Sequence, residues 1–257
     1  MEFRILGPVE VRGGDAELTR DGVKPRTVLA ALLLSGDKLI SDEQMSDVLW
    51  GPHPPATSYA QIHTYVSRLR KIVGSRSAIV RRSPGYRLDI GTAHFDFAEF
   101  QNEAERGRTA LFSGRYEEAA KRYRAALHLW RGPALAGVTE YLASSAGPRL
   151  EEDRLSVLER RLDADLALGR AAEILPELAQ LVAQHPLRER FRAQLMTVLY
   201  RCDRQADALT VFDEGRRVLA EEFGIDPGAL LREVHQAILT GTPALVWPGA
   251  GPVPLVR

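Results

Sequence analysis

The sequence predicts two domains of different class, an α+β domain over residues 1–93 and an all-α domain over residues 94–241. Three observations predict this division. Strand-like runs and tight turns are concentrated in the first 93 residues, amphipathic helical periodicity fills the chain from Phe95 onward, and a proline-rich tail with little charge begins at Thr242. We expect this tail, residues 242–257, to be flexible.

The first domain begins with short strands and two helices. Residues 3–6 and 9–12 read as strands around a Gly7-Pro8 break, and a turn at residues 13–15 follows them. The apolar run of residues 28–33 predicts a short buried helix, which Pro25 can begin. A second helix, ending near Trp50, is expected to start with a capping box.

The capping box is formed by Ser41 and Gln44. The serine hydroxyl can accept a hydrogen bond from the Gln44 amide while the glutamine side chain reaches back to the serine backbone. The glycine and prolines of residues 51–55 then preclude a helix, and a third helix is predicted from about Thr57 to Val73, stopped by Gly74.

The third helix has two distinct faces. Its apolar stripe consists of Tyr59, Ile62, Val66, Leu69 and Val73. The opposite face is small, polar and basic, and consists of Ala60, Thr64, Ser67 and Lys71, flanked by Gln61, Arg68 and His63. The first face therefore suits the core and the second suits a ligand or solvent.

Residues 79–90 predict a β-hairpin with a basic tip. Pro84 and Gly85 suit the two central positions of a type II turn, and Arg81 and Arg82 precede it. Strands, three helices with a basic third helix, and a terminal hairpin together predict a winged helix-turn-helix.

The charge pattern indicates a polyanionic partner for this domain. The whole chain has 34 basic and 34 acidic residues, yet no acidic residue lies between Asp47 and Asp89, where there are seven basic ones. An α-helix fits the major groove of DNA, where arginine bonds guanine bidentately and threonine can meet the thymine methyl group. The third helix is the expected reading element.

Within that helix we expect Arg68 and Thr64 to read bases, Gln61 to be a secondary reader, and Lys71 and Arg70 to contact phosphates. A wing arginine can enter a narrow minor groove, and Tyr86 either supports the wing by packing or touches the sugar-phosphate backbone. The expected DNA-binding residues are Gln61, Thr64, Tyr65, Arg68, Arg70, Lys71, Arg81, Arg82 and Tyr86.

The second domain reads as paired helices, beginning with Asp96 and Glu99 as a helix start. Amphipathic segments are expected at about 97–112, 115–130, 148–168, 171–184, 187–201, 204–222 and 227–239. The helix joints at residues 168–171 and 202–206 have turns 34 residues apart, which is the tetratricopeptide spacing, and residues 113–120 form the same kind of joint. Such helix pairs either form a groove for a partner protein or bury one another and supply a dimer surface.

No sequence pattern indicates an enzyme. The chain has no phosphate-binding loop, nucleophile elbow, zinc-protease helix or dinucleotide fingerprint, and its six histidines are scattered. We expect no catalytic residue, no cofactor and no metal site. The single cysteine, Cys202, and the charged first seven residues are typical of a cytoplasmic protein, and no window is apolar enough for a membrane span.

Two sets of motifs resemble known domains. Residues 65–74 (YVSRLRKIVG) and 82–88 (RSPGYRL) resemble the OmpR-type winged-helix output domain. Residues 114–116 (GRY), 130–135 (WRGPAL) and 223–231 (FGIDPGALL) resemble the bacterial transcriptional activator domain. Over about residues 1–240 the chain resembles the short, two-domain form of the Streptomyces antibiotic regulatory protein family.

This resemblance implies an activator of a specialised-metabolite (antibiotic) gene cluster. Such an activator would bind double-stranded DNA at head-to-tail direct repeats near a −35 region, as a dimer or tandem pair, and recruit RNA polymerase through its sigma subunit. By position, Arg68 matches the family's base-contacting arginine and Arg82 its minor-groove arginine. The loop from residue 51 to 56 matches the polymerase contact, for which we expect Gly51, Pro52, His53 and Pro54. Neither a phosphoacceptor nor a nucleotide-binding domain is recognised, so no phosphorylation or ATP control is inferred.

A second hypothesis is a protein-interaction adaptor. In that case the helical repeats bind a partner protein, and the basic domain binds DNA weakly and without a preferred site.

Overall fold

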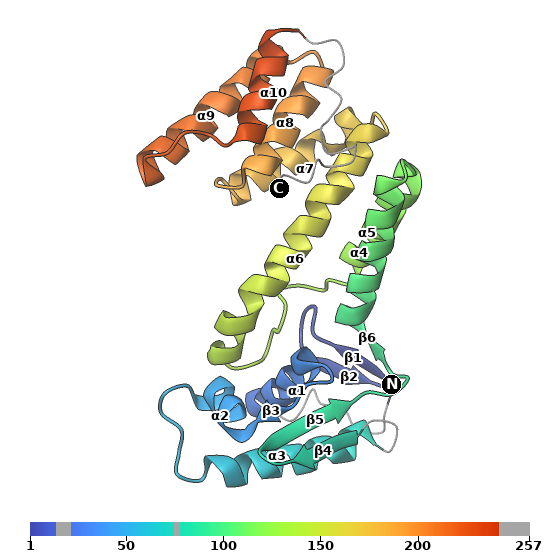
Figure 1. Ribbon diagram of the computed structural model, residues 1–257, viewed down its shortest axis with the longest axis vertical. Coiled ribbons are helices and arrows are strands. Elements are labelled where there is room, and N and C mark those ends of the chain that lie inside the picture. Colours follow the sequence, from blue (N-terminus) through green and yellow to red (C-terminus); the bar gives the residue numbers. More distant parts are fainter. Residues whose placement is uncertain (14–21, 75–77, 242–257) are drawn as a thin grey trace. The chain divides into compact units, whose positions relative to one another are not determined.

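The computed structural model describes residues 1–13, 22–74 and 78–241. The predicted tail at 242–257, and residues 14 and 15 of the first predicted turn, lie outside these residues. The chain forms two compact units, drawn in Figure 1. The first unit comprises residues 1–102 and 125–155, and the second comprises residues 103–124 and the chain from Ser156 onward.

The described elements alternate in type only in the first part of the chain. The strands are β1 (Glu2–Arg4), β2 (Glu10–Arg12), β3 (Ile40–Ser41), β4 (Ala78–Arg82), β5 (Gly85–Asp89) and β6 (His94–Phe95). The helices are α1 (Val23–Ser35), α2 (Asp42–Trp50), α3 (Ser58–Val73), α4 (Asp96–Phe112), α5 (Tyr116–His128), α6 (Glu140–Ala167), α7 (Ala171–Gln184), α8 (Glu189–Arg201), α9 (Gln205–Phe223) and α10 (Ala229–Leu239).

The first strands form a small sheet with the order β2-β1-β6, in which β1 is antiparallel to β2 and parallel to β6. Phe3 pairs with Val11 and with Phe95. Phe3 and Val11 are both buried, so one face of this sheet lies on the core. The alternation of apolar and charged residues in the two strands produces this one-sided burial.

Helices α1 and α2 form as their sequences predict. Every residue of the predicted apolar run 28–33 is buried in α1. The helix begins at Val23, two residues before Pro25, which was predicted to begin it. Both hydrogen bonds of the predicted capping box are present at the start of α2: the Gln44 amide donates to Ser41 Oγ over 3.1 Å, and the Ser41 amide donates to Gln44 Oε1 over 3.0 Å.

Helix α3 differs from the prediction in its first turn. Its buried stripe consists of Ser58, Ile62, Val66, Leu69, Ile72 and Val73. Tyr59 was predicted to belong to this stripe, but its side chain is 60% exposed. The residue four positions before Ile62 on the same face is Ser58, so the stripe continues through the serine and the tyrosine turns outward.

The β4–β5 hairpin is present, but its predicted turn is wrong by one residue. Arg82 pairs with Gly85, which makes Ser83 and Pro84 the central residues, joined by a cis peptide bond. Gly85 has no left-handed φ. A Cβ atom there would lie 1.9 Å from the Ile40 carbonyl oxygen, so glycine is required by the close approach of β3.

The helical prediction is confirmed except at α6. This helix begins at Glu140, eight residues before the predicted start, and continues through Pro148. Proline removes one helical hydrogen bond and normally ends a helix. Leu142 and Leu150, on either side of the proline, are buried, and this burial offsets the lost bond.

The predicted repeat joints share one hydrogen-bonding pattern. At each joint an arginine amide reaches back five residues: Arg115 to the Ala110 oxygen, Arg170 to Asp165 and Arg204 to Leu199, over 2.9, 3.0 and 2.9 Å. The residue before each arginine, Gly114, Gly169 or Asp203, has a positive φ. This six-residue closure is a Schellman-type helix end. The chain is therefore a winged helix-turn-helix followed by a tetratricopeptide-like helical domain.

Candidate nucleic-acid interface

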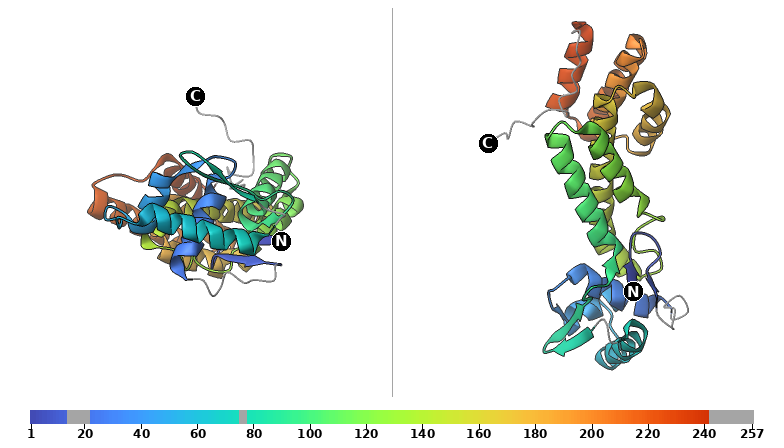
Figure 2. Two further views of the ribbon diagram at one scale, coloured as in Figure 1. Left: turned by 90° about the horizontal axis from the view of Figure 1, so that it is seen from below. Right: turned by 90° about the vertical axis from the view of Figure 1, so that its right-hand side faces the viewer.

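The outer face of α3 is open within the first unit. Seen from below in Figure 2 (left), α3 lies in front of the other elements of that unit. Thr64, Ser67, Arg68 and Lys71 are all exposed on it. Among the described residues, no hydrogen bond or ion pair engages the side chain of Arg68 or Lys71. These two cations are available to a polyanion.

The other predicted DNA-contacting residues on α3 make hydrogen bonds along the helix. Gln61 Nε2 donates to Thr57 Oγ1 over 2.9 Å, and the Tyr65 hydroxyl donates to Gln61 Oε1 over 3.2 Å. Thr64 Oγ1 donates to the Ala60 carbonyl over 2.9 Å. Each bond joins residues four apart along α3 or to its N-cap residue Thr57, so the polar face is ordered before any ligand binds.

Arg70 has a different environment from Lys71. Its Nε and Nη2 atoms donate to the Ile79 carbonyl oxygen over 2.9 and 2.7 Å, which joins α3 to β4. Figure 1 shows α3 and the hairpin side by side. Arg70 therefore fixes the hairpin to the helix, a task that helical periodicity could not reveal because the acceptor lies beyond the helix.

The two wing arginines are also in contrasting environments. Arg81 makes a bidentate ion pair with Asp42 at 2.5 and 2.7 Å, and its guanidinium lies 4.6 Å from the ring centre of Tyr86. Hydrogen bonding to the Asp42 carboxylate raises the pKa of Arg81. Arg82 is exposed and makes no hydrogen bond or ion pair with the described residues.

Tyr86 supports the wing from inside. Its side chain is only 3% exposed, beneath Arg81. Of the two interpretations of Tyr86, its position favours packing, because a buried ring presents little surface to a nucleic acid. The Asp42 amide donates to the Pro84 carbonyl over 2.9 Å, so the hairpin turn is held to the start of α2.

The loop between α2 and α3 contains the residues expected to contact polymerase. Pro52, His53 and Pro54 are exposed, and Gly51 is half-buried with a φ of 62°. A Cβ atom on Gly51 would lie 2.3 Å from Cε1 of Tyr141, so the tyrosine ring rests directly on this glycine. No local sequence pattern predicts this contact, because it joins residues 90 positions apart.

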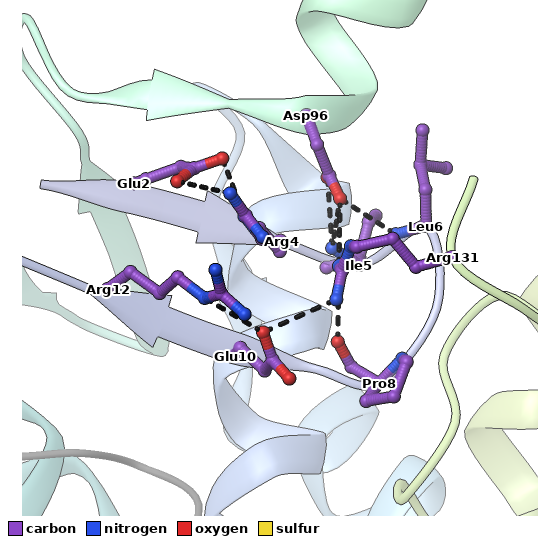
Figure 3. A network of polar contacts seen from close by, with 9 residues as sticks. All are labelled: Glu2, Arg4, Ile5, Leu6, Pro8, Glu10, Arg12, Asp96 and Arg131. Atoms are coloured by element: carbon purple, nitrogen blue, oxygen red, sulfur yellow. Dashed lines mark hydrogen bonds and ion pairs between the residues drawn. The ribbon is translucent and has the colours of Figure 1, made fainter. Parts of the chain in front are cut away.

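The N-terminal sheet is held by a buried carboxylate that the sequence marked only as a helix start. Asp96 accepts hydrogen bonds from the amides of Ile5 and Leu6 over 2.9 to 3.0 Å and from the Arg131 guanidinium over 3.3 Å, as drawn in Figure 3. Arg131 also donates to Glu10 and to the Pro8 carbonyl. Burial raises the pKa of Asp96, while the two amides and Arg131 oppose that rise.

The described residues contain neither a candidate membrane span nor a metal-binding cluster. None of their helices combines the length and apolarity that a bilayer crossing requires. No three histidine, cysteine, aspartate or glutamate side chains gather there in a metal-binding group.

Comparison with known proteins places this geometry in a family. Residues 95–239 match the bacterial transcriptional activator domain. The chain is 41% identical over 254 residues to the regulatory protein AfsR of Streptomyces griseus, which covers 99% of this chain and 26% of AfsR. It is 35% identical over 256 residues to the regulatory protein DnrI of Streptomyces peucetius, covering 95% of this chain and 94% of DnrI.

A solved structure is similar over nearly the whole chain. Mycobacterium tuberculosis EmbR, in complex with a low affinity phosphopeptide, superposes with a TM-score of 0.89 at 33% identity, covering 97% of this chain and 67% of that one. The chain spans about a quarter of the length of its AfsR relatives and nearly all of DnrI. With its winged helix and its matched activator domain, the chain belongs to the Streptomyces antibiotic regulatory protein family of transcriptional activators.

Proposed function

We propose that this protein is a sequence-specific DNA-binding activator that reads the major groove with α3 and the minor groove with the β4–β5 hairpin. The observation that carries the proposal is the placement of three exposed cations, Arg68 and Lys71 on α3 and Arg82 on the hairpin, none paired with a described residue. The neighbouring Arg70 and Arg81 are engaged in holding the hairpin. Free cations on two adjacent elements suit a duplex backbone and its grooves.

In this proposal Arg68 and Thr64 read base edges, and Lys71 neutralises a phosphate. Gln61 and Tyr65, already bonded to each other, supply secondary contacts. Arg82 enters the minor groove. The hairpin is fixed against α3 and α2 by Arg70, Arg81 and Tyr86, which in this way support DNA binding. Phosphate contacts by the two arginines are additional to this structural role.

The finer features of the proposal rest on the family. Two subunits bind head-to-tail direct repeats near a −35 region, and the loop of residues 51–54 meets RNA polymerase and its sigma subunit. The regulated genes form a specialised-metabolite cluster, and the activity takes place in the cytoplasm, where bacterial DNA lies. The names of AfsR and DnrI as regulatory proteins support a regulatory role.

Fluorescence anisotropy with a duplex selected from a randomised pool, and with a matched scrambled duplex, tests the proposal. Arg68→Ala should weaken binding to the selected duplex by about 1–3 kcal/mol and reduce the preference for it. Lys71→Ala should weaken both duplexes alike and lower the salt slope by about one. Ser67→Ala, on the same exposed face, is the matched control.

An unchanged preference in Arg68→Ala would show that the base-reader assignment is wrong. If the wild-type protein itself binds both duplexes weakly and equally, the proposed function fails and the adaptor hypothesis becomes the better one.

A further inference from the structure

One residue of the activator domain connects three helices of the first unit. The Thr139 amide donates to Thr27 Oγ1 on α1 over 2.9 Å, and Thr27 is fully buried. Thr139 Oγ1 donates to the Val48 carbonyl on α2 and accepts from the Leu142 amide on α6. Thr139 immediately precedes α6, so its side chain occupies the position of an N-cap.

The hydrogen bond to Val48 provides a donor for a carbonyl group at the end of α2 that has no helical donor. In a continuing helix the Val48 carbonyl would accept from the amide of residue 52, but that residue is Pro52, which has no N–H. The Gly51 amide closes the helix on the Asp47 carbonyl instead, over 2.8 Å. The Thr139 hydroxyl therefore satisfies a carbonyl that the chain's own next turn cannot.

Tyr141 contacts Gly51, the first residue of the loop after α2. Its ring lies where a Gly51 side chain would be, although the tyrosine itself is nearly half exposed. Gly51 has a left-handed φ, so it is the point at which the backbone leaves α2 for the loop toward α3. Thr139 and Tyr141 therefore both contact the end of α2, at the point where the loop begins.

We propose that Thr139 and Tyr141 are positioning residues for the α2–α3 loop, the segment of residues 51–57, which is exposed except at the half-buried Gly51 and Pro55. They hold it in the conformation that a partner protein recognises. Helix α3 is held independently by its own buried stripe and by Arg70, so the two residues affect the loop more than the DNA-reading face. This inference rests on the proposed function in one respect, because the loop's partner is taken to be RNA polymerase.

Hydrogen exchange of the free 257-residue chain tests the positioning without DNA or polymerase. Thr139→Val should raise the exchange of the Gly51 and Ser58 amides, which donate to the Asp47 and Pro55 carbonyls at the two ends of the loop, about fivefold, as expected for the loss of one partly buried hydrogen bond. Amides of residues 28–33 in α1 should change little. Thr139→Ser restores the hydroxyl and should restore protection. Tyr141→Ala should behave like the valine variant, and Tyr141→Phe like the wild type.

Activation and DNA binding are then measured on the same variants. Thr139→Val and Tyr141→Ala should reduce activated transcription in vitro about fivefold at saturating protein while operator affinity stays within about twofold. Unchanged loop exchange in both variants would overturn the inference. So would an equal loss of affinity, activation and overall stability, because that pattern indicates a general structural role. If the wild type neither selects an operator nor activates, the proposed function fails, while the exchange data still decide the positioning role.

Discussion

Arg81 and Arg82 are neighbours in the chain, and the fold gives them different tasks. Successive residues of a strand point to opposite faces, so only one of them can face Asp42. Arg81 takes that place, with its guanidinium over the Tyr86 ring. Arg82 lies at the end of β4 beside the turn and remains exposed. A substitution at each position should therefore affect a different measurable property.

We expect Arg82→Ala to weaken DNA binding and reduce its salt slope by about one, because it removes one cation from the contact with DNA. Arg81→Ala should lower the free energy of unfolding by about 0.5–1 kcal/mol, since it breaks a part-exposed ion pair, and should have the smaller effect on the salt slope. Anisotropy titrations at several salt concentrations and urea denaturation separate the two effects. A larger salt-slope change in Arg81→Ala than in Arg82→Ala would contradict this assignment.

Among the elements, the N-terminus of α4 does more than begin a helix. Asp96 lies in its first turn, where a carboxylate is favoured by the helix dipole, and it also receives backbone amides from the chain after β1. Phe97 and Phe100 on the same helix stack at a centroid distance of 6.2 Å, and Phe100 contacts the Trp130 ring. The start of α4 thus holds the N-terminal sheet and the 130–136 segment together.

Asp96→Ala should lower the free energy of unfolding by about 3 kcal/mol or more. The substitution leaves the amides of Ile5 and Leu6 without their acceptor and removes a partner of Arg131 in a buried place. Urea denaturation followed by circular dichroism measures the loss. Glu99→Ala is the control, because Glu99 is an exposed acid in the same turn. Equal losses in the two variants would show that the helix dipole, and not the buried network, is responsible.

At the scale of the whole molecule, the winged helix includes residues from the matched activator domain. The Arg131, Leu135 and Ala136 amides donate to the carbonyls of Leu6, Ile5 and Gly7, over 2.8 to 3.0 Å. The Val9 amide donates to the Ala136 carbonyl over 3.1 Å. Compact packing accordingly groups residues 125–155 with residues 1–102. The boundary at residue 93 that the sequence predicts separates the motifs of the two domains. It does not state whether each part folds alone, which a comparison of fragments measures.

We expect a fragment of residues 1–93 to be markedly less stable than one of residues 1–155. The shorter fragment lacks Asp96, Arg131, Thr139 and the four backbone hydrogen bonds of the 131–136 segment, each worth about 1 kcal/mol. Urea midpoints and the dispersion of amide resonances compare the two. Equal midpoints would show that the winged helix folds independently of the activator domain.

The sequence by itself determined the features that depend on neighbours a few residues apart. The capping box of α2, the polar and buried faces of α3, and the repeated helix joints all arise from contacts between residues three to five positions apart. Backbone geometry fixes these spacings, so a pattern of residue types is enough to predict them. The exposed positions of Thr64, Arg68 and Lys71 follow from the same periodicity.

Only the tertiary structure decided which polar groups are satisfied by distant parts of the chain. Arg70 meets Ile79 on the next element, and Arg81 meets Asp42 and Thr139 meets Val48 across long stretches of the chain, through pairing that no local period encodes. Similarly, position 85 requires glycine because the Ile40 backbone approaches it closely, and the turn beside it does not impose this requirement. A buried or half-buried polar group must find a partner, but packing in three dimensions selects which partner it finds. That selection separates the arginines that hold the wing from those left for a ligand.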